Sequence, residues 1–413
     1  GETFQGFLKK DEMDGKEFAL FVDTVDLGDF VEVSGSLFLT KRKEKTLQVK
    51  HWRMLSKSLR PLPDKWHGLE NVEERFRKRY LDTISSPEVK ERFVLRSQII
   101  TSLRSLLDKA GYLEVETPLL QPLAGGATAL PFKTHHNALN IDLFLRIAPE
   151  LYLKMLLVGG FTKVYEIGRN FRNEGIDVTH NPEFTMLEFY EAYSDASQQM
   201  VFVEKLFRDV VKKIKKDGTI EYDGTKIDFK KKFNIISYFD LLKRYALISH
   251  PESVTPEELV VKARQLAVPV DIKDAPEKIM DNIYKKVCRP KLIQPTFIIE
   301  YPVASSPFAK KSEDNKLFID RFQLVVGGVE LVNAFSELND PRDQRERYAL
   351  EERKRGKGDT EISPSDEAYL EAMEYGMPPA GGVGIGVDRL VMLLTDQKNI
   401  REVILFPTLR PKN

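Results

Sequence analysis

The sequence contains a single cysteine, Cys288, among its 413 residues. One thiol cannot form an internal disulfide, and it cannot supply a cysteine-rich metal site. No stretch approaches ~18 uninterrupted apolar residues, so we expect no membrane span. The first residues, GETFQGF, do not have the pattern of a secretory signal peptide. Together these absences favour the reducing cytoplasm as the location and argue against a membrane partner.

The chain also lacks a net charge, because its 63 basic residues balance 63 acidic ones. Proteins that coat nucleic acid are usually basic, so the balance argues against that role for the chain as a whole. Two local basic patches remain, KRKEK at 41–45 and RFRKR at 75–79. Each could bind a phosphate backbone, and a solvated hairpin tip or helix face is an equally good interpretation.

What is present is the composition of a globular protein, with 42% apolar and 31% charged residues. A chain of this length can bury a large core and form two or more domains. Residues 1–60 are predicted to be all-β, because short β-rich runs stand at 19–22 (ALFV), 30–39 and 46–55.

A proline-punctuated stretch that begins at residue 58 predicts a linker, which we place at 61–85. The next predicted element is a helix that begins near Ser86. Pro87 stands at its first position and Gly111 just past its end, which are the favoured places for these residues. We assign residues 86–413 to one large domain.

The order of elements in the large domain predicts an α+β fold. Strands dominate residues 112–193, and a largely helical insertion follows at about 195–290, with a hairpin at 217–229. Strands return at 296–301 and 320–337, and a glycine-rich strand leads into a helix at 381–395. Because strands and helices come in blocks, we expect a mixed or antiparallel sheet and not a doubly wound one.

Two of the predicted strands carry polar side chains on one face, since alternate residues of a strand point the same way. A strand on a wet sheet surface explains either segment alone, but two such segments in one chain favour a shared polar pocket. The residues concerned are Phe184, Met186, Glu188 and Tyr190 in FTMLEFY (184–190) and Asn333, Phe335 and Glu337 in VNAFSEL (332–338).

Two upstream segments add charged candidates, Glu150 in RIAPELYLK (146–154) and Arg172 in RNFRNEG (169–175). Arginine can hold a carboxylate or a phosphate through two parallel hydrogen bonds, and a structural salt bridge with Glu174 is the alternative. His180 precedes an Asn-Pro turn signal, so it is expected in a loop, where a lone histidine is usually solvated.

The glycine-rich segment GGVGIGVDR (381–389) matches neither a Walker loop nor a Rossmann fingerprint. Its glycines lie inside the predicted strand, with Gly384 and Gly386 on one face. They would leave a flat surface on which a planar group could lie, and Arg389 follows at the start of the next helix.

Together these segments resemble the class II aminoacyl-tRNA synthetases, and within them the lysyl-tRNA synthetases. Residues 171–190 (FRNEG…HNPEFTMLEFY) are similar to motif 2 of that family, 382–394 to motif 3, and KAGYLEVETPLL (109–120) to motif 1. RIAPELYLK, NAFSELNDP (333–341) and the segment from LSKSLRPLP to RYLD (55–82) resemble the lysine enzymes in particular.

The resemblance implies an antiparallel catalytic sheet, a homodimer formed through the motif 1 region, and an N-terminal OB-fold anticodon domain. The β-rich residues 1–60 would be that β-barrel, although it looks short by its first strand. The implied reaction has two steps. ATP and L-lysine give lysyl-adenylate and pyrophosphate, and the lysyl group then passes to the 3′ end of tRNA-Lys.

The resemblance also implies a role for each motif residue. Glu150 and the backbone at Gly126 would hold the lysine α-ammonium, Asn333 the carboxylate, Glu337 and Tyr190 the ε-ammonium, and Phe335 the alkyl stem, with Glu188 in support. Arg172 would bridge the lysine carboxylate and the ATP α-phosphate, and it would be catalytic together with Arg389. The ATP-binding residues would be Arg172, Glu174, His180, Asn181, Phe184, Glu330, Gly386 and Arg389, with Phe184 and Arg389 on either side of the adenine.

The implied cofactor is Mg²⁺, and here the sequence departs from the family. Acidic ligands usually stand at two positions before NAFSEL; Glu330 matches one, but the other is Gln323. An amide oxygen is a neutral and weaker ligand for Mg²⁺ than a carboxylate, which puts the number of ions in doubt. Strict alternation also places Glu330 opposite to Asn333, so its role requires a bulge or bend after Gly327–Gly328.

Three other functions remain open. A lysyl-transferase that modifies a protein acceptor would lack the anticodon domain, part of which residues 17–55 resemble. A catalytically silent paralogue would be a binding protein, which the intact Arg172, Glu174, Glu337 and Arg389 oppose. An enzyme specific for aspartate or asparagine would need a different side-chain pocket, with a cation for aspartate.

Overall fold

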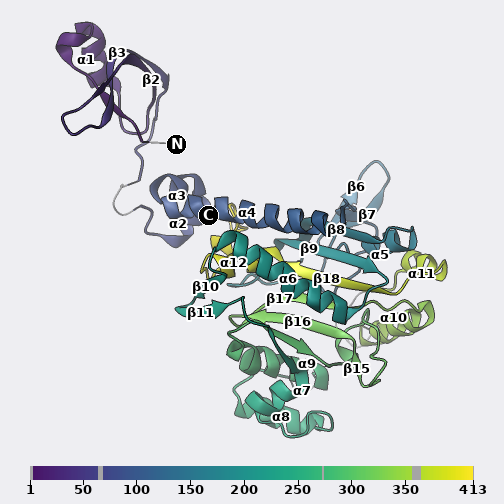
Figure 1. Ribbon diagram of the computed structural model, residues 1–413. Coiled ribbons are helices and arrows are strands. Elements are labelled where there is room, and N and C mark those ends of the chain that lie inside the picture. The colour runs from purple at the N-terminus through teal and green to yellow at the C-terminus, as the bar shows by residue number, and fades with distance from the viewer. Residues whose placement is uncertain (1–2, 64–67, 272–273, 356–363, 413) are drawn as a thin grey trace. The chain divides into compact units, whose positions relative to one another are not determined.

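The computed structural model describes residues 3–63, 68–271, 274–355 and 364–412. The chain divides into two compact units, Gly1–Lys90 and Glu91–Asn413 (Figure 1). Within the described residues, no helix is both long enough and apolar enough to cross a membrane.

The N-terminal unit contains a three-stranded sheet of β1 (Gln5–Phe7), β2 (Phe30–Leu39) and β3 (Lys45–Ser56). Strand β3 lies in the middle, antiparallel to β2 and parallel to β1. Strands β2 and β3 therefore agree with the runs predicted at 30–39 and 46–55.

The prediction that residues 1–60 are all-β is wrong at 19–22, which lie in the helix α1 (Gly15–Thr24). Asp14 caps this helix, since its side chain accepts hydrogen bonds from the backbone N–H groups of Lys16 and Glu17 at 2.9 and 3.1 Å. Four consecutive apolar residues are typical of a strand, but the Asp14 cap and the packing of Phe21 stabilise a helix here. Phe21 packs edge-to-face on Trp52 of β3, with ring centroids 5.1 Å apart.

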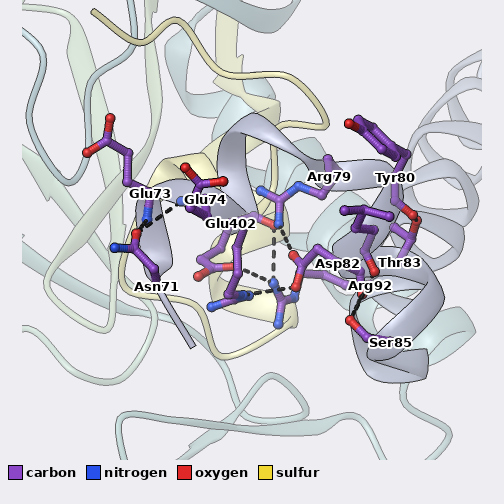
Figure 2. Close-up of polar contacts among 12 residues, drawn as sticks. Asn71, Glu73, Glu74, Arg79, Tyr80, Asp82, Thr83, Ser85, Arg92 and Glu402 are labelled. Carbon is purple, nitrogen blue, oxygen red and sulfur yellow. Dashed lines mark hydrogen bonds and ion pairs between the residues drawn. The ribbon is translucent and has the colours of Figure 1, made fainter. Parts of the chain in front are cut away.

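The predicted linker contains two short helices, α2 (Val72–Arg77) and α3 (Arg79–Ser85). The side chain of Asn71 caps α2. In α3, Arg79 forms an ion pair with Asp82 at 2.6 Å, and both side chains are buried (Figure 2). Neighbouring ion pairs are Arg75 with Asp82, Arg77 with Glu73, and Lys78 with Glu74. The RFRKR patch is thus paired with carboxylates of its own unit, which favours the structural interpretation over phosphate binding.

The larger unit is built on an eight-stranded sheet. The strand order is β12 (Asn234–Ser237), β13 (Thr296–Ile299), β16 (Arg321–Val326), β17 (Val329–Ser336), β18 (Ala380–Gly386), β9 (Glu183–Ala192), β8 (Lys163–Phe171) and β4 (Leu113–Glu114). All neighbours are antiparallel except the two edge pairs, β12 with β13 and β4 with β8. The mixed, mainly antiparallel sheet expected from the sequence is confirmed.

One face of this sheet is covered by the helices α4 (Pro87–Lys109), α6 (Ala196–Ile214) and α12 (Val387–Leu394). In Figure 1, α6 and α12 lie across β9, β18 and β17. The apolar face of these strands packs into the same core as the three helices, through Leu187, Phe189, Val332, Ala334, Val383 and Ile385. The opposite face, which carries the polar residues, is therefore left for a site.

The insertion predicted at about 195–290 is largely helical. After α6, the hairpin β10 (Thr219–Tyr222) and β11 (Thr225–Asp228) leads to α7 (Tyr238–Leu241), α8 (Pro256–Gln265) and α9 (Pro276–Ile283), with π-helical turns after α7 and α9. A capping box at α8, and a proline at the first helical position of both α8 and α9, explain where these two helices begin.

The remaining elements surround the polar face. They are β5 (Leu120–Gln121), β6 (Lys133–His136), β7 (Ile141–Leu145), α5 (Glu150–Val158), β14 (Tyr301–Pro302), β15 (Phe318–Ile319), α10 (Pro341–Arg355) and α11 (Glu367–Glu374). Helix α5 packs on β8, β9 and α11. It thereby carries Glu150 and Lys154 to the sheet.

Candidate active site

On the polar face of the sheet, β18 contributes a row of glycines, Gly382, Gly384 and Gly386, which we call the glycine trough. Gly382 lies opposite Tyr190 of β9 and Phe335 of β17, and Gly384 lies opposite Glu188 and Asn333. Because the middle strand contributes no side chains on this face, the side chains of both flanking strands can meet above it. The structure thus brings together, on one face, the polar residues of the two segments that the sequence singled out.

At one end of the trough, a lysine lies between two acidic residues. The Lys154 Nζ is 2.6 Å from Glu150 Oε1 and 2.5 Å from Glu337 Oε2. All three side chains are buried, and Lys154 has no exposed surface. Burial acts to lower the pKa of Lys154, but the two carboxylates outweigh it and hold that pKa well above its usual range.

Both oxygens of Glu337 are buried without a hydrogen-bond partner among the described residues; Oε2 has the ion pair with Lys154, and Oε1 has no such contact. A Cβ added to Gly382 would lie 1.9 Å from this Oε1 and 2.4 Å from Tyr190 Cε1, so only glycine leaves room for both groups. Burial raises the pKa of Glu337 well above its usual range, and the attraction of Lys154 offsets only part of this. A buried carboxylate oxygen without a partner is costly, which indicates that a cationic ligand completes the site.

Glu150 lies next to Gly126, and these are the two residues predicted to hold the lysine α-ammonium. A Cβ on Gly126 would lie 2.9 Å from Glu150 Cβ, and the residue has a φ of +84°, which favours glycine. Glu150 also contacts Lys154, which in turn contacts Glu337, so the predicted α-ammonium subsite and the predicted ε-ammonium subsite are connected through Lys154.

Glu188 lies at the centre of the trough, and the Tyr190 hydroxyl donates to its Oε2 at 3.0 Å. Burial and the nearby carboxylate of Glu150 raise the pKa of Glu188 to about 8. The raised pKa favours retention of a proton on Glu188 at pH values where an ordinary glutamate is ionised. A bound ammonium group would favour its release.

Asn333 is oriented by a residue that the sequence did not single out, Arg321 of β16. The Arg321 Nε donates to Asn333 Oδ1 at 2.8 Å, and its guanidinium lies over the Tyr301 ring at 4.5 Å. With its oxygen held in this way, Asn333 can present its amide N–H groups to a carboxylate.

Arg172 and Phe184 form the next part of the site. The Arg172 guanidinium lies 5.1 Å from the centre of the Phe184 ring, and burial lowers the pKa of Arg172. Its Nε is buried without a partner within the described chain, which leaves it available to a ligand. The carboxylate of Glu174 accepts a long bond of 3.4 Å from the Leu130 N–H, and this side chain is otherwise exposed.

Arg389 joins two other predicted residues, just after Gly386 at the start of α12. Its Nη2 is 3.0 Å from His180 Nε2, and its Nη1 donates to the backbone oxygen of Glu330 at 3.3 Å. Asn181 is placed differently, because its amide donates to the Glu183 carbonyl at 2.6 Å. It lines a surface pocket with Arg96, Arg169, Glu183, Ile404, Leu405 and Phe406.

The bulge required for Glu330 is present, at Leu331. Leu324 pairs with Val332, but Val325 pairs with Glu330, so Leu331 is an extra residue in β17. Residues that pair across neighbouring strands point to the same face of a sheet. Glu330 pairs with Val325, and Asn333 pairs with Gln323; Val325 and Gln323 are two residues apart and so share a face. The bulge thus returns Glu330 to the polar face, where strict alternation would not have put it.

Gln323 is on the same face, but its amide oxygen is already engaged. The hydroxyls of Tyr301 and Tyr284 donate to Gln323 Oε1 at 2.6 and 3.3 Å. Both acceptor positions of this oxygen are therefore occupied, which disfavours it as a metal ligand. Among the described residues, no cluster of three or more His, Cys, Asp or Glu could hold a metal ion by itself.

Comparison with known families gives the geometry its context. The family model for class II tRNA synthetases of the D, K and N group matches residues 71–410, most of the chain and all the site residues above. The chain belongs to this family. As a class II synthetase, it also has the mainly antiparallel sheet that the resemblance implied.

Relatives of this class II synthetase are named lysine–tRNA ligase. The protein of Carboxydothermus hydrogenoformans is 49% identical over 409 residues, which is 99% of this chain and 84% of that protein. The protein of Syntrophomonas wolfei is 48% identical over 411 residues, 100% of this chain and 83% of that one. The protein of Moorella thermoacetica is 49% identical over 412 residues, 99% and 83% of the two chains.

Three residues of the site escaped the sequence analysis: Lys154, Arg321 and Gly382. The only local signal for Lys154 is its i, i+4 spacing from Glu150 on a helix. Gly382 could have been found by extending the alternation of Gly384 and Gly386 by two residues. Nothing near Arg321 in the sequence indicates its bond to Asn333.

Proposed function

We propose that this chain is a lysine–tRNA ligase, which activates L-lysine with ATP and transfers the lysyl group to the 3′ end of tRNA-Lys. The observation that carries the proposal is the buried, unpartnered Oε1 of Glu337 at the end of a pocket that also contains Glu150 and Glu188. Such a pocket suits an amino acid with an ammonium group at each end. The names of the relatives agree with it.

Each end of the amino acid has a partner of suitable chemistry. Glu337 and Tyr190 would receive the ε-ammonium, with Phe335 along the alkyl stem, and Glu150 with the backbone of Gly126 would hold the α-ammonium. Asn333, whose oxygen is held by Arg321, would donate to the carboxylate. Aspartate would instead need a cation where Glu337 lies, and asparagine would leave that carboxylate unpaired.

Formation of the adenylate requires no protein nucleophile, because the lysine carboxylate itself attacks the α-phosphorus and pyrophosphate leaves. The protein must align the two reactants and neutralise charge at the phosphorus. We assign this to Arg172 and Arg389. Arg172 lies next to the predicted lysine subsite and already stacks on Phe184.

ATP would lie between Phe184 and Arg389, with its adenine over the glycine trough near Gly386. Glu174, His180 and Asn181 complete the proposed ATP set. Support is uneven: His180 contacts Arg389 at 3.0 Å, whereas Asn181 lines a different pocket.

The residues fit Mg²⁺ at one position and not at the other. Glu330 offers a half-buried carboxylate on the polar face, with Arg289 no closer than 3.9 Å. Gln323 offers an oxygen that two hydroxyls already occupy. Glu330 would hold Mg²⁺ together with ATP phosphates, and a bound ion would neutralise charge on the phosphate chain.

The acceptor and the assembly are also proposals. The N-terminal unit would be an OB-type anticodon domain, and exposed Phe30 and Leu37 of β2 offer a surface for bases. A homodimer would form through the motif 1 region, where Val94, Leu113 and Leu120 are about half exposed. The single cysteine supports the reducing cytoplasm as the location.

The experiment that tests the proposal is lysine-dependent ATP–pyrophosphate exchange without tRNA, with aspartate and asparagine as matched substrates. Exchange with lysine alone, followed by charging of tRNA-Lys, is the expected result. Exchange with lysine but no charging of tRNA would favour a protein acceptor. No exchange with any of the three amino acids would favour a silent binding protein and overturn the proposal.

A further inference from the structure

We propose that Lys154 is a built-in counter-cation that sets the net charge of the amino-acid pocket, and that it thereby matches the pocket to a ligand with one net positive charge. This inference rests on the proposed function. It concerns a residue that would not touch the reacting atoms, so Lys154 is a positioning and specificity residue.

The position of Lys154 shows that its charge is held in the pocket and not at the surface. Its side chain has no exposed area, and its Nζ contacts Glu150 at 2.6 Å and Glu337 at 2.5 Å. Three aromatic rings surround the same ammonium group, with centres 5.0 Å (Phe308), 5.4 Å (Phe335) and 5.9 Å (Tyr369) away. The ammonium is thus fixed between the two carboxylates that would bind the two ends of lysine.

The charges of the pocket can be followed one by one. Lys154 is the cation that faces the carboxylates of Glu150 and Glu337. Arg172 lies near Glu188, and Glu174 and Glu330 also act on it. Arg146 also lies near Glu188, but it is paired with Glu166 at 2.5 Å. When Lys154, Glu150 and Glu337 are all ionised, this cluster has one uncompensated negative charge, and L-lysine carries one net positive charge.

Without Lys154 the same pocket would have two uncompensated negative charges. A dication would then match it better than lysine does. L-Lysinol is a suitable probe, because it has both ammonium groups of lysine but a hydroxyl in place of the carboxylate. It binds without being activated, so its affinity reports on the pocket alone.

The test measures the affinities of L-lysine and L-lysinol for the full chain by calorimetry at pH 7.5, in the wild type, in three variants of the pocket residues and in one control variant. Lys154→Met makes the pocket more negative, and Glu150→Gln makes it less negative. The double variant, Lys154→Met with Glu150→Gln, restores the wild-type net charge and leaves one unpaired carboxylate, Glu337, where the single variant leaves two, which helps if the single variant does not fold. Lys163→Met removes a cation paired with Glu191 outside the trough and is the control.

We expect the preference for lysine over lysinol to follow the pocket charge. It should fall at least ~10-fold in Lys154→Met, rise in Glu150→Gln, and stay near the wild-type value in the double variant and in Lys163→Met. A purely structural role would lower both affinities together and leave the preference unchanged across the series, which would overturn the inference. If the wild-type protein binds no lysine at all, the proposed function fails first.

Discussion

Replacement of Gly382 by alanine is the sharpest perturbation that the trough allows. The new Cβ would lie 1.9 Å from Glu337 Oε1 and 2.4 Å from Tyr190 Cε1, whereas ordinary contacts begin at 3.4 Å. Glu337 or the strand must therefore move by more than about 1 Å. Misplacement of about 1 Å in a binding group can cost ~10²-fold in rate.

We therefore expect Gly382→Ala to lower kcat/KM for lysine by about 100-fold, equivalent to about 2.7 kcal/mol, in the ATP–pyrophosphate exchange assay. The KM for ATP should change much less, because the strain falls on the groups proposed to bind the lysine side chain. Circular dichroism and a melting curve would check that the variant folds.

Two other glycines calibrate this prediction. A Cβ on Gly384 would meet the flexible end of Met186 at 3.2 Å, so Gly384→Ala should have a smaller effect. A Cβ on Gly15, in the N-terminal unit, would meet nothing within 4 Å, and Gly15→Ala should leave exchange unchanged. Wild-type lysine kinetics in a folded Gly382→Ala protein would refute the assigned position of Glu337.

The remaining predictions concern charge and metal. Glu337→Gln should raise the KM for lysine at least ~10-fold, about 1.4 kcal/mol, and unchanged lysine kinetics would remove Glu337 from the ε-ammonium site. Glu188 has a pKa of about 8 in the fold, above its unfolded value, so the native state holds a proton that the unfolded chain releases and wild-type stability falls as pH rises toward 8. Glu188→Gln should avoid this cost, so its stability advantage over the wild type should grow from pH 5 to pH 8.5. At pH 8.5 the advantage should be on the order of 3 kcal/mol in free energy of unfolding, visible as a higher melting temperature. A difference independent of pH would contradict the assignment. Gln323→Glu should tighten Mn²⁺ binding in the presence of ATP roughly 10-fold, measured by electron paramagnetic resonance, because a carboxylate is a stronger ligand than an amide. Equal Mn²⁺ affinity in the two proteins would show that position 323 does not face the metal.

Several parts of the fold follow from local sequence because local physics determines them. The limits of α4 were predictable, since Pro87 favours a first helical position and Gly111 adopts a φ of +84° just past the last turn. The faces of β9 and β17 were predictable from alternation, which depends only on the pleat of a strand. The run at 19–22 was not, because its helix depends on the Asp14 cap and on packing against Trp52.

The same distinction between local sequence and long-range packing applies to the site. The sequence by itself determined which residue types could hold an amino acid and a nucleotide, and which of them share a strand face. Only the tertiary structure decided that Glu330 returns to that face, because a bulge is defined by pairing with another strand. It also decided the contact of Lys154 with Glu337 and the need for glycine at 382. These depend on distances between segments far apart in the chain, and no local pattern encodes such distances.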